Sequence, residues 1–390
     1  MPQRLGNAER RARLGRRHHL ATGCDDVVTV AGDLSGLHSS DPATVYLAAW
    51  ARTPDLRGEM VDAALYVDRS LLRILGMRGT MFVVPRDAAA VIDAACTRHL
   101  VAAERTRLVR MLEAQGIATD GEAWLADVER RTLDALVRRG EATAVELRTE
   151  VPELQEQLVL GQGKTWEGTF GVSTRVLFLL ATAGRIVRAR PLGTWISSQY
   201  RWAATERWVE GGLPSLPTET ARTELTRRWL RTFGPATERD LKWWTGWTMG
   251  DTRRSLADAG AVAVDLEDGA GVALADDLEP VAAPPPWVAL LPGLDPTVMG
   301  WKEREWYLGE HRRRLFDRNG NAGPTVWAHG HVVGGWAQRR DGEVVVRLLE
   351  DVGGDAAAMI ADEAGRLALW LGNMRITPRF RTPIEQELNR

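Results

Sequence analysis

Residues 70–85 read SLLRILGMRGTMFVVP, two apolar runs that are separated around Arg78-Gly79-Thr80. Apolar runs of this length on either side of a glycine-containing break indicate a β-hairpin or a helix-to-strand turn. Helices are expected ahead of this segment, over the arginine-rich residues 8–20 and over residues 42–52, where Pro42 occupies the first turn. Helices followed by a hairpin are the order of elements in a winged-helix unit.

The same succession of helices and hairpin recurs twice further along the chain. Apolar residues at helical spacing predict helices over residues 86–114, 119–139, 173–183, 218–233, 235–244 and 248–259, with short helical segments over 141–160. Strand pairs are expected within residues 184–201, broken at Pro191-Leu192-Gly193, and within residues 261–275, with a turn at Asp268-Gly269. The order of elements therefore predicts three tandem winged helices.

A proline-rich linker, Pro280–Pro286, separates a C-terminal region of different character. This region has strand-like runs over residues 288–291, 325–327 and 344–348 and one helix over residues 356–371. The predicted fold class is α+β: three tandem winged-helix units followed by a small β-rich, barrel-like domain. The expected domains are residues 1–115 (the first unit with the following helix), 116–212, 213–280 and 285–390.

Composition limits the classes of function. The chain of 390 residues has a formal net charge of −2, which argues against indiscriminate nucleic-acid binding but allows a local basic cleft. No apolar run is long enough to span a membrane, and the arginine-rich start has no signal-peptide core, so we expect a cytoplasmic protein without membrane contact. Cys24 and Cys96 are too few and too far apart for a disulfide framework or a cysteine zinc site, and no cofactor is expected.

Tandem winged helices generally bind DNA, because a recognition helix enters the major groove while basic residues of the wing contact the backbone. Double-stranded DNA is therefore the expected partner. The candidate DNA-binding residues lie on the first two hairpins: Arg78, Thr80, Arg185, Arg188, Arg190, Trp195, Tyr200 and Arg201. Two alternatives remain open. The hairpin of residues 184–201 is an ordinary strand pair whose arginines face solvent, or the winged helices bind other proteins.

Several short motifs resemble those of one protein family. They are Gly36–Pro42 (GLHSSDP), Trp50-Ala51-Arg52, Met77–Pro85, Leu291–Pro296 (LPGLDP) and Asn319–Trp336. In order and spacing they resemble the AlkZ-like family of winged-helix DNA glycosylases. The resemblance implies three winged helices that form a concave DNA-binding surface, closed by a C-terminal β-barrel. It also implies excision of alkylated or crosslinked purine bases.

The catalytic positions of the family differ in this chain. Where glycosylase members have Gln-x-Gln or Gln-x-Asp, the alignment to Asp41-Pro42 gives His38 and Ser40, and Phe82 stands where members often have histidine. Hydrolysis of an N-glycosidic bond needs a group that holds or deprotonates water while positive charge develops on the sugar. A neutral His38 could accept a proton from water, and Ser40 could bind the water or a phosphate. Asp41 could orient the imidazole, stabilise the cation or simply cap the helix that begins at Pro42.

The sequence leaves three functions open. The first is a monofunctional glycosylase, since no lysine falls in the motif; the second is a DNA-binding protein or regulator without catalysis; the third is a protein-interaction module. Other motifs carry less weight. His329-x-His331 lacks a nearby cluster of further ligands, so no metal site is predicted. Gly161–Thr165 lacks the first glycine of a phosphate-binding loop, and Asp295 is interpreted as a turn former.

Overall fold

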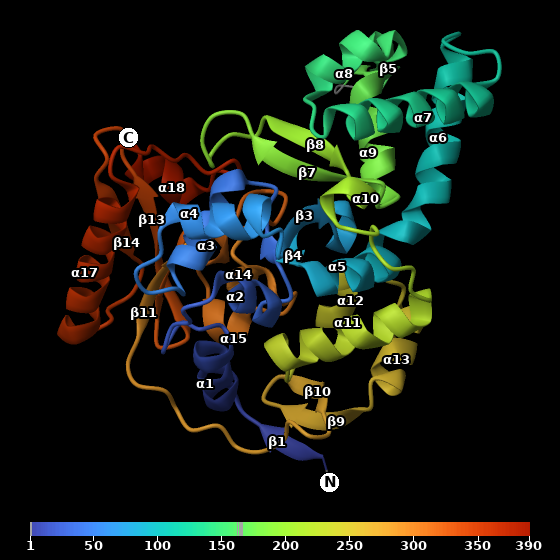
Figure 1. The fold of residues 1–390 in the computed structure, drawn as a ribbon. Coiled ribbons are helices and arrows are strands. Elements are labelled where there is room, and N and C mark those ends of the chain that lie inside the picture. The colour runs from blue at the N-terminus through green and yellow to red at the C-terminus, as the bar shows by residue number, and fades with distance from the viewer. Residues whose placement is uncertain (1, 162, 164–166) are drawn as a thin grey trace.

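The two apolar runs of residues 70–85 form a β-hairpin in the computed structural model, which describes residues 2–161, 163 and 167–390 (Figure 1). Strands β3 (Leu71–Leu75) and β4 (Met81–Pro85) pair antiparallel, and every residue in them is buried. A third, two-residue strand, β2 (Leu37–His38), pairs with β4 in the sheet order β2-β4-β3. Gly36 allows this close approach, because a Cβ there would lie 2.9 Å from Cγ1 of Val84. The hairpin is therefore the centre of the N-terminal unit.

Helices surround this hairpin at the N-terminus. The expected helices at residues 8–20 and 42–52 are confirmed as α1 (Asn7–Arg17) and α3 (Pro42–Trp50). Helix α2 (Val27–Asp33) was not expected from the sequence; it begins where the Asp26 side chain accepts the amide hydrogens of Val28 and Thr29. Helices α4 (Gly58–Asp62) and α5 (Arg86–Ile92) flank the hairpin on its two chain ends.

Residues 101–208 form the lobe at the top of Figure 1. Its helices are α6 (Val101–Ala114), α7 (Gly121–Arg139), α8 (Ala144–Glu150), α9 (Val172–Thr182) and α10 (Thr205–Trp208). Its strand pairs are β5 (Gln157–Leu160) with β6 (Gly168–Gly171), and β7 (Ile186–Pro191) with β8 (Tyr200–Ala204). The expectation of helical segments throughout residues 141–160 was wrong at its end, where β5 alternates exposed and buried residues as a strand does.

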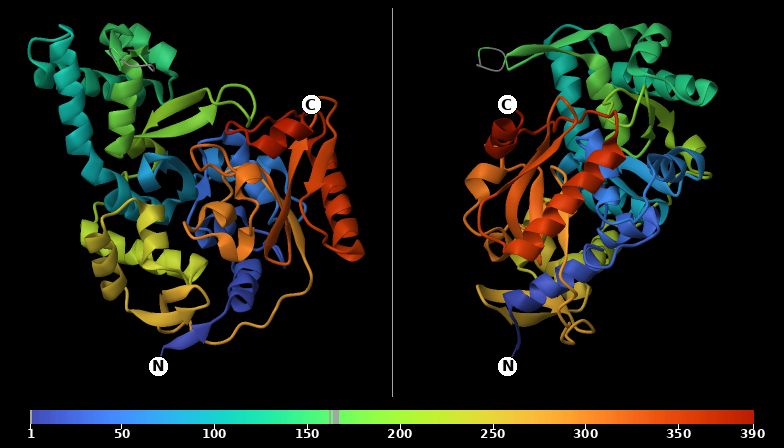
Figure 2. Two further views of the ribbon diagram at one scale, coloured as in Figure 1. Left: turned by 180° about the vertical axis from the view of Figure 1, so that it is seen from behind. Right: turned by 90° about the vertical axis from the view of Figure 1, so that its left-hand side faces the viewer.

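The third succession also forms, with one strand supplied from far away in sequence. Helices α11 (Thr218–Phe233), α12 (Glu238–Thr245) and α13 (Met249–Asp258) precede the hairpin of β9 (Ala261–Leu266) and β10 (Gly269–Leu274). Strand β1 (Gln3–Leu5) pairs parallel with β9, so the N-terminus closes this sheet at the lower end of the molecule (Figures 1 and 2). Helices followed by a hairpin thus occur three times.

The C-terminal region is an open sheet with helices, and the expected barrel was wrong. Strands β11 (Val288–Leu291), β12 (Thr325–Ala328), β13 (His331–Gln338) and β14 (Val344–Leu348) pair antiparallel in chain order, and within the described residues β11 and β14 do not pair with each other. The helices are α14 (Pro296–Met299), α15 (Glu305–Leu308), α16 (Arg312–Leu315), α17 (Gly354–Leu371) and α18 (Pro383–Leu388). Helix α17 packs on β11 and β14, which closes the unit without further strands.

Two of the short motifs meet in the core. The Arg52 guanidinium forms a fully buried, two-pronged ion pair with Asp295, with N to O distances of 2.7 and 2.9 Å, and a third bond to Thr297. Asp295 also caps α14, as its interpretation as a turn former suggested. One large core joins the N-terminal, third and C-terminal units, whereas residues 108–204 have a core of their own. Tryptophans 50, 229, 327 and 336 are among the largest fully buried side chains and serve as core.

Candidate functional site

The segment from β2 to α3, residues 38–41, has a defined position between the hairpin and α3. His38 lies opposite Phe82 in the sheet, with ring centroids 4.9 Å apart, and the Ser39 amide donates to the Met81 carbonyl at 2.8 Å. His38, Ser39 and Asp41 are buried, and Ser40 is partly buried. We call residues 38–41 the β2–α3 connection.

The hydrogen bonds of His38 decide which of its nitrogens carries the proton. The Ser40 amide donates to Nδ1 at 3.3 Å, so Nδ1 presents a lone pair and the neutral ring carries its proton on Nε2. Burial, helped by the positive charge of Arg78, lowers the pKa of His38 to about 3. At neutral pH His38 is therefore an uncharged hydrogen-bond donor. In this tautomer the lone pair of Nδ1 is already engaged by the Ser40 amide.

Asp41 is a helix cap, and it also joins the C-terminal segment to the site. One carboxylate oxygen accepts the Ala43 amide of α3 at 3.1 Å, and the other accepts the Arg379 amide at 2.8 Å. Arg379 also donates from Nη1 to the Ser40 carbonyl at 3.0 Å. Burial raises the pKa of Asp41 although these amide hydrogen bonds oppose the shift. The capping role considered from sequence is thus confirmed.

A buried arginine connects the β2–α3 connection to the second hairpin. Arg73, on β3, donates from Nη1 to the Ser39 hydroxyl, and its guanidinium lies 4.8 Å from the centroid of the Tyr200 ring. On β7, Arg188 lies 5.0 Å from the same ring and 5.2 Å from that of Trp202. The structure therefore brings two of the predicted DNA-binding residues, Arg188 and Tyr200, close to His38, Ser40 and Asp41.

The other candidates on the second hairpin do not share this location. Arg190 pairs with Asp62 at 2.7 Å, and Trp195 stacks on Tyr46 with a centroid distance of 5.0 Å. Arg185 is exposed at the start of the hairpin, and Arg201 lines a cavity described below. The predicted residues of this hairpin thus lie in different surroundings: Arg190 is in an ion pair, Trp195 is in the packing against Tyr46, and Arg201 is at the cavity.

Arg78 and Thr80 occupy the turn of the first hairpin. Arg78 has a positive φ of 56°, and its guanidinium lies 4.2 Å from the ring centroid of Trp243 on α12. The Arg304 guanidinium lies 4.7 Å from the same ring. The Thr80 hydroxyl donates to the Met77 carbonyl at 3.0 Å and so stabilises the turn. Arg78 is exposed and available to a ligand, whereas the hydroxyl of Thr80 already has a structural partner.

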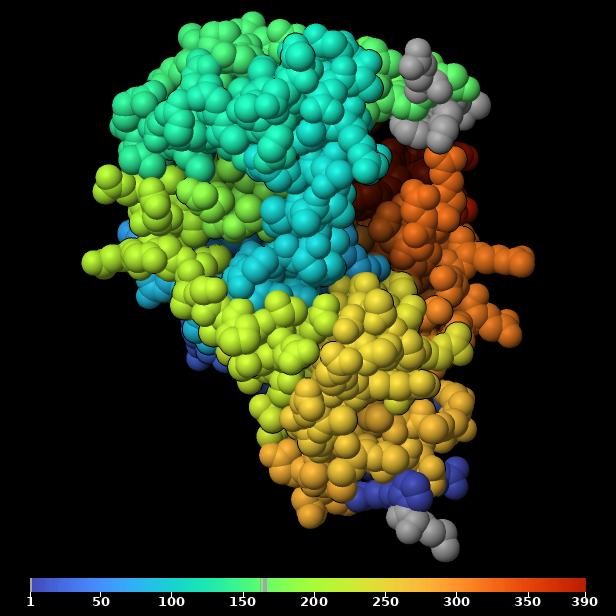
Figure 3. All heavy atoms as spheres, turned by 90° about the vertical axis from the view of Figure 1, so that its right-hand side faces the viewer, coloured from blue at the N-terminus to red at the C-terminus, as the bar shows by residue number. Residues whose placement is uncertain are grey.

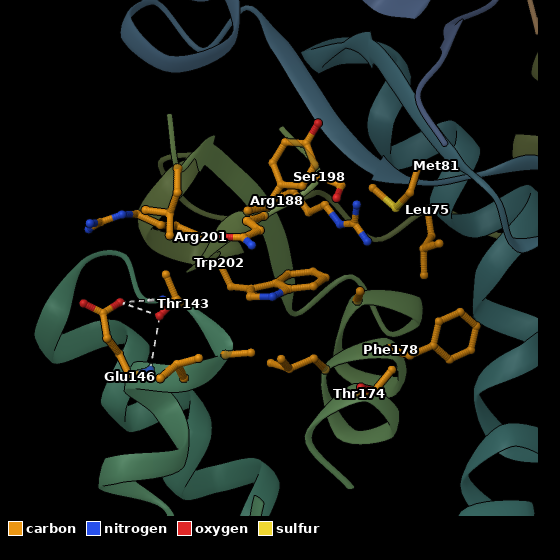
Figure 4. Close-up of a pocket in the computed structure, with 17 residues that line it drawn as sticks. Leu75, Met81, Thr143, Glu146, Thr174, Phe178, Arg188, Ser198, Arg201 and Trp202 are labelled. Atoms are coloured by element: carbon orange, nitrogen blue, oxygen red, sulfur yellow. Dashed lines mark hydrogen bonds between the residues drawn. The ribbon is translucent and has the colours of Figure 1, made fainter. Parts of the chain in front are cut away.

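A cavity of about 860 Å³ lies between the first two hairpins and helices α8 and α9 (Figure 4). Leu75 and Met81 line it from the first hairpin, Phe178 from α9, and Arg188, Arg201 and Trp202 from the second hairpin. None of residues 38–41 lines the cavity, but the carbonyl of the lining residue Met81 accepts the Ser39 amide. The apolar floor of the cavity with two guanidinium groups suits a planar group with polar edges.

The molecular surface is hollowed on the side shown in Figure 3. The walls are formed by segments near residues 100–110 and 240–260 on one side and by segments of the C-terminal unit on the other, with residues near the C-terminus between them.

The remaining motifs have structural explanations or fall outside the described residues. The His329 Nδ1 accepts the Trp287 amide at 2.9 Å, and no group of three or more His, Cys, Asp or Glu that could hold a metal occurs in the described ranges. Residues 162, 164 and 165 of the segment Gly161–Thr165 lie outside the described residues. None of the described helices is both long and apolar enough to cross a membrane.

Sequence reasoning missed two arginines of this site. Arg73 stands in the middle of the apolar strand LLRIL, where a buried charge is costly, and that position could have marked it. Arg379 lies 338 residues from Asp41 in a segment without a motif, so only the folded chain identifies it.

Comparison with known proteins matches this chain to a family model and to a solved structure. A family model described as "DNA glycosylase AlkZ-like" matches residues 31–370. The solved structure of Streptomyces sahachiroi DNA glycosylase AlkZ matches with a TM-score of 0.69 and 21% sequence identity, covering 92% of this chain and 96% of that chain. At this identity the structural likeness shows a common fold. None of the curated proteins matches this sequence.

Proposed function

The chain belongs to the AlkZ-like DNA glycosylase family, and from this membership we propose that it hydrolyses the N-glycosidic bond of alkylated or crosslinked purines in double-stranded DNA. The observation that carries the proposal is the β2–α3 connection. It holds a neutral His38, a partly buried Ser40 and the carboxyl group of Asp41, and the Ser39 amide bonds to the carbonyl of Met81, which lines the cavity that contains Arg188. A DNA substrate also agrees with the cytoplasmic location expected from sequence.

The proposed mechanism uses these groups without a covalent intermediate. A purine alkylated on a ring nitrogen is cationic and leaves as a neutral base, so it needs little help from an acid. Positive charge then develops on the sugar, and the Asp41 carboxylate stabilises it while accepting its two amide hydrogen bonds. His38 donates from Nε2 to the attacking water and, with the Ser40 hydroxyl, fixes its position. The water oxygen bonds to C1′ of the sugar as the bond to the base breaks, and the proton that the water loses passes to solvent. The absence of lysine from residues 36–42 argues against a Schiff-base route.

We further propose that the three helix–hairpin successions are winged-helix units. The proposed boundaries are residues 1–115, 116–212 and 213–280, with residues 285–390 as the C-terminal unit. The second core supports a distinct second unit, although it also takes in Leu108 and Leu112 of α6, which precede the proposed boundary at residue 116. The first and third units share a core with the C-terminal unit, so they are expected to unfold together.

The test is base release from duplexes that each carry one modified purine, N7-alkylguanine or N3-alkyladenine, scored as abasic sites. The wild type should release the base, and His38→Ala should lower the rate about 10²-fold, as loss of one positioned donor does. The double variant His38→Gln, Ser40→Gln restores the residue types of the family and should retain release. His331→Ala is the matched control, because His331 is exposed on β13.

Two outcomes would favour the other functions. Failure of the wild type and of the double variant to release any base, with salt-sensitive DNA binding retained, would favour a DNA-binding protein without catalysis. Weak binding to DNA that does not respond to salt would favour a protein-interaction module.

A further inference from the structure

Three arginines beside the β2–α3 connection have no anionic partner of their own. Some buried arginines of this chain form ion pairs, such as Arg13 with Glu9 and Arg52 with Asp295, whereas others, such as Arg304, form none among the described residues. Within the described part of the chain, the guanidinium groups of Arg73, Arg188 and Arg379 form no ion pair with a carboxylate. Because an uncompensated charge close to the protein interior is costly, such a group calls for a partner.

The same place also collects polar atoms without partners. The buried polar side-chain atoms with no hydrogen-bond partner among the described residues include Nε of Arg73, Nε of Arg188 and the hydroxyl group of Tyr200. Tyr200 joins these groups, since its ring lies 4.8 Å from the Arg73 guanidinium and 5.0 Å from that of Arg188. Native proteins rarely leave several buried polar atoms unsatisfied in one place.

The arginines differ in access to solvent, and this difference assigns their roles. Arg73 is 2% exposed and already donates to Ser39, so it contributes positive charge from the interior and does not contact a ligand directly. Arg188 is partly exposed at the cavity, and Arg379 is exposed beside Ser40 and Asp41. Burial lowers the pKa of Arg188 to about 10, and the positive charges of Arg73 and Arg379 add to this effect. Three positive charges therefore converge on a place where Asp41 supplies one negative charge.

We propose that Arg188 and Arg379, supported by Arg73 and Tyr200, bind one phosphodiester group of the DNA strand that carries the lesion. The fork of a guanidinium matches two phosphate oxygens, and of the three arginines Arg188 and Arg379 are the two that are open to solvent. Arg379 also holds the Ser40 carbonyl, so the bound phosphate fixes the sugar relative to the β2–α3 connection. This inference rests on the proposed function and adds to it the residues that position the scissile nucleotide.

The test measures binding, so that it does not depend on base release. The probe is a duplex with a tetrahydrofuran abasic-site analogue, in which a neutral methylphosphonate replaces one phosphate of that strand at a time. At one position the substitution should weaken binding of the wild type about tenfold, as loss of a charged hydrogen bond does. It should also lower the slope of log K against log salt concentration by about 0.9.

Substitution of the protein should have the same effect as substitution of that phosphate. Arg188→Gln and Arg379→Gln should each weaken binding of the duplex in which every phosphate is intact. For these two variants, the methylphosphonate at the position that affects the wild type should weaken binding by less than a further factor of two, because the contact has already been lost. Arg188→Lys keeps the charge and should restore the salt slope. Arg366→Gln is the control, because Arg366 is exposed on α17 and pairs with Glu363.

The proposal is overturned by two results. The first is that no methylphosphonate position affects binding, or that a position does affect it but with the same loss of affinity in Arg188→Gln and Arg379→Gln as in the wild type. The other is that inorganic phosphate abolishes the effect of both substitutions while every methylphosphonate duplex binds equally, which would indicate a site for free phosphate. A chain that shows the expected binding pattern but releases no base would retain this inference and lose the catalytic proposal.

Discussion

Replacement of His38 by glutamine is expected to make the fold less sensitive to acid. His38 titrates near 6.5 when the chain is unfolded, and burial lowers its pKa to about 3 in the folded protein. Between these values the unfolded state binds the additional proton, so the free energy of unfolding falls as the pH drops from 6.5 towards 3. This contribution is fully present above pH 6.5.

The size of the effect follows from the same two pKa values. At pH 5 an unfolded histidine with pKa 6.5 is almost fully protonated while the folded His38 remains neutral. The proton stabilises the unfolded state by about 2 kcal/mol relative to pH 7.5, at about 1.4 kcal/mol for each pH unit below 6.5. Glutamine cannot titrate, so the free energy of unfolding of His38→Gln should fall by about 2 kcal/mol less than that of the wild type over this range.

The assay is urea unfolding of both proteins at pH 7.5, 6.5, 5.5 and 5.0. The buried His18, whose pKa burial also lowers, is present in both proteins and cancels from the difference. Phe82→Leu is the control, because it removes the ring packed against His38 and leaves the imidazole in place. It should lower stability by a similar amount at each pH. If the wild type and His38→Gln lose stability in parallel, His38 is charged or solvated in the folded protein, and its assignment as a neutral donor is refuted.

Two further predictions concern the ends of α3. Asp41→Asn keeps a capping oxygen for the Ala43 amide and should cost less stability than Asp41→Ala, which should lower the free energy of unfolding by about 0.5–2 kcal/mol. Both variants should lower the rate of base release, because both remove the carboxylate. If Asp41→Asn releases the base as fast as the wild type, the role of Asp41 is capping alone. Asp295→Ala leaves the fully buried Arg52 without its partner and should lower the free energy of unfolding by about 3–5 kcal/mol in urea, while Arg314→Ala, which breaks an exposed pair, should cost less than about 1 kcal/mol.

The hydrophobic pattern was enough to predict most of the elements. The alternation in residues 261–275 and the apolar runs of residues 70–85 carry their hairpins locally, because the side chains that pair lie close in sequence. The helices α3 and α9 have apolar sequences with clear starts, and both were expected within a few residues of their observed bounds. Local signals failed where the partner is remote, as for β1, which forms a strand only because β9 accepts it.

The barrel expectation failed for a related reason. The sequence indicates strands and turns in residues 285–390, but whether the last strand returns to the first depends on how the sheet twists and on what covers it. Here α17 packs on both edge strands, β11 and β14, and takes the place that further pairing would have filled. A run of apolar residues with helical spacing predicts the helix and leaves open which surface it covers.

The sequence by itself determined the family motifs, the substituted positions His38 and Ser40, and the cap at Asp41, since each depends on neighbours within a few residues. Only the tertiary structure decided the chemistry of those positions. Burial makes His38 a neutral donor, and Arg73 and Arg379 reach the β2–α3 connection from residues far away in the chain. The physical reason is that desolvation and charge act through distance in space, which the order of residues along the chain does not contain.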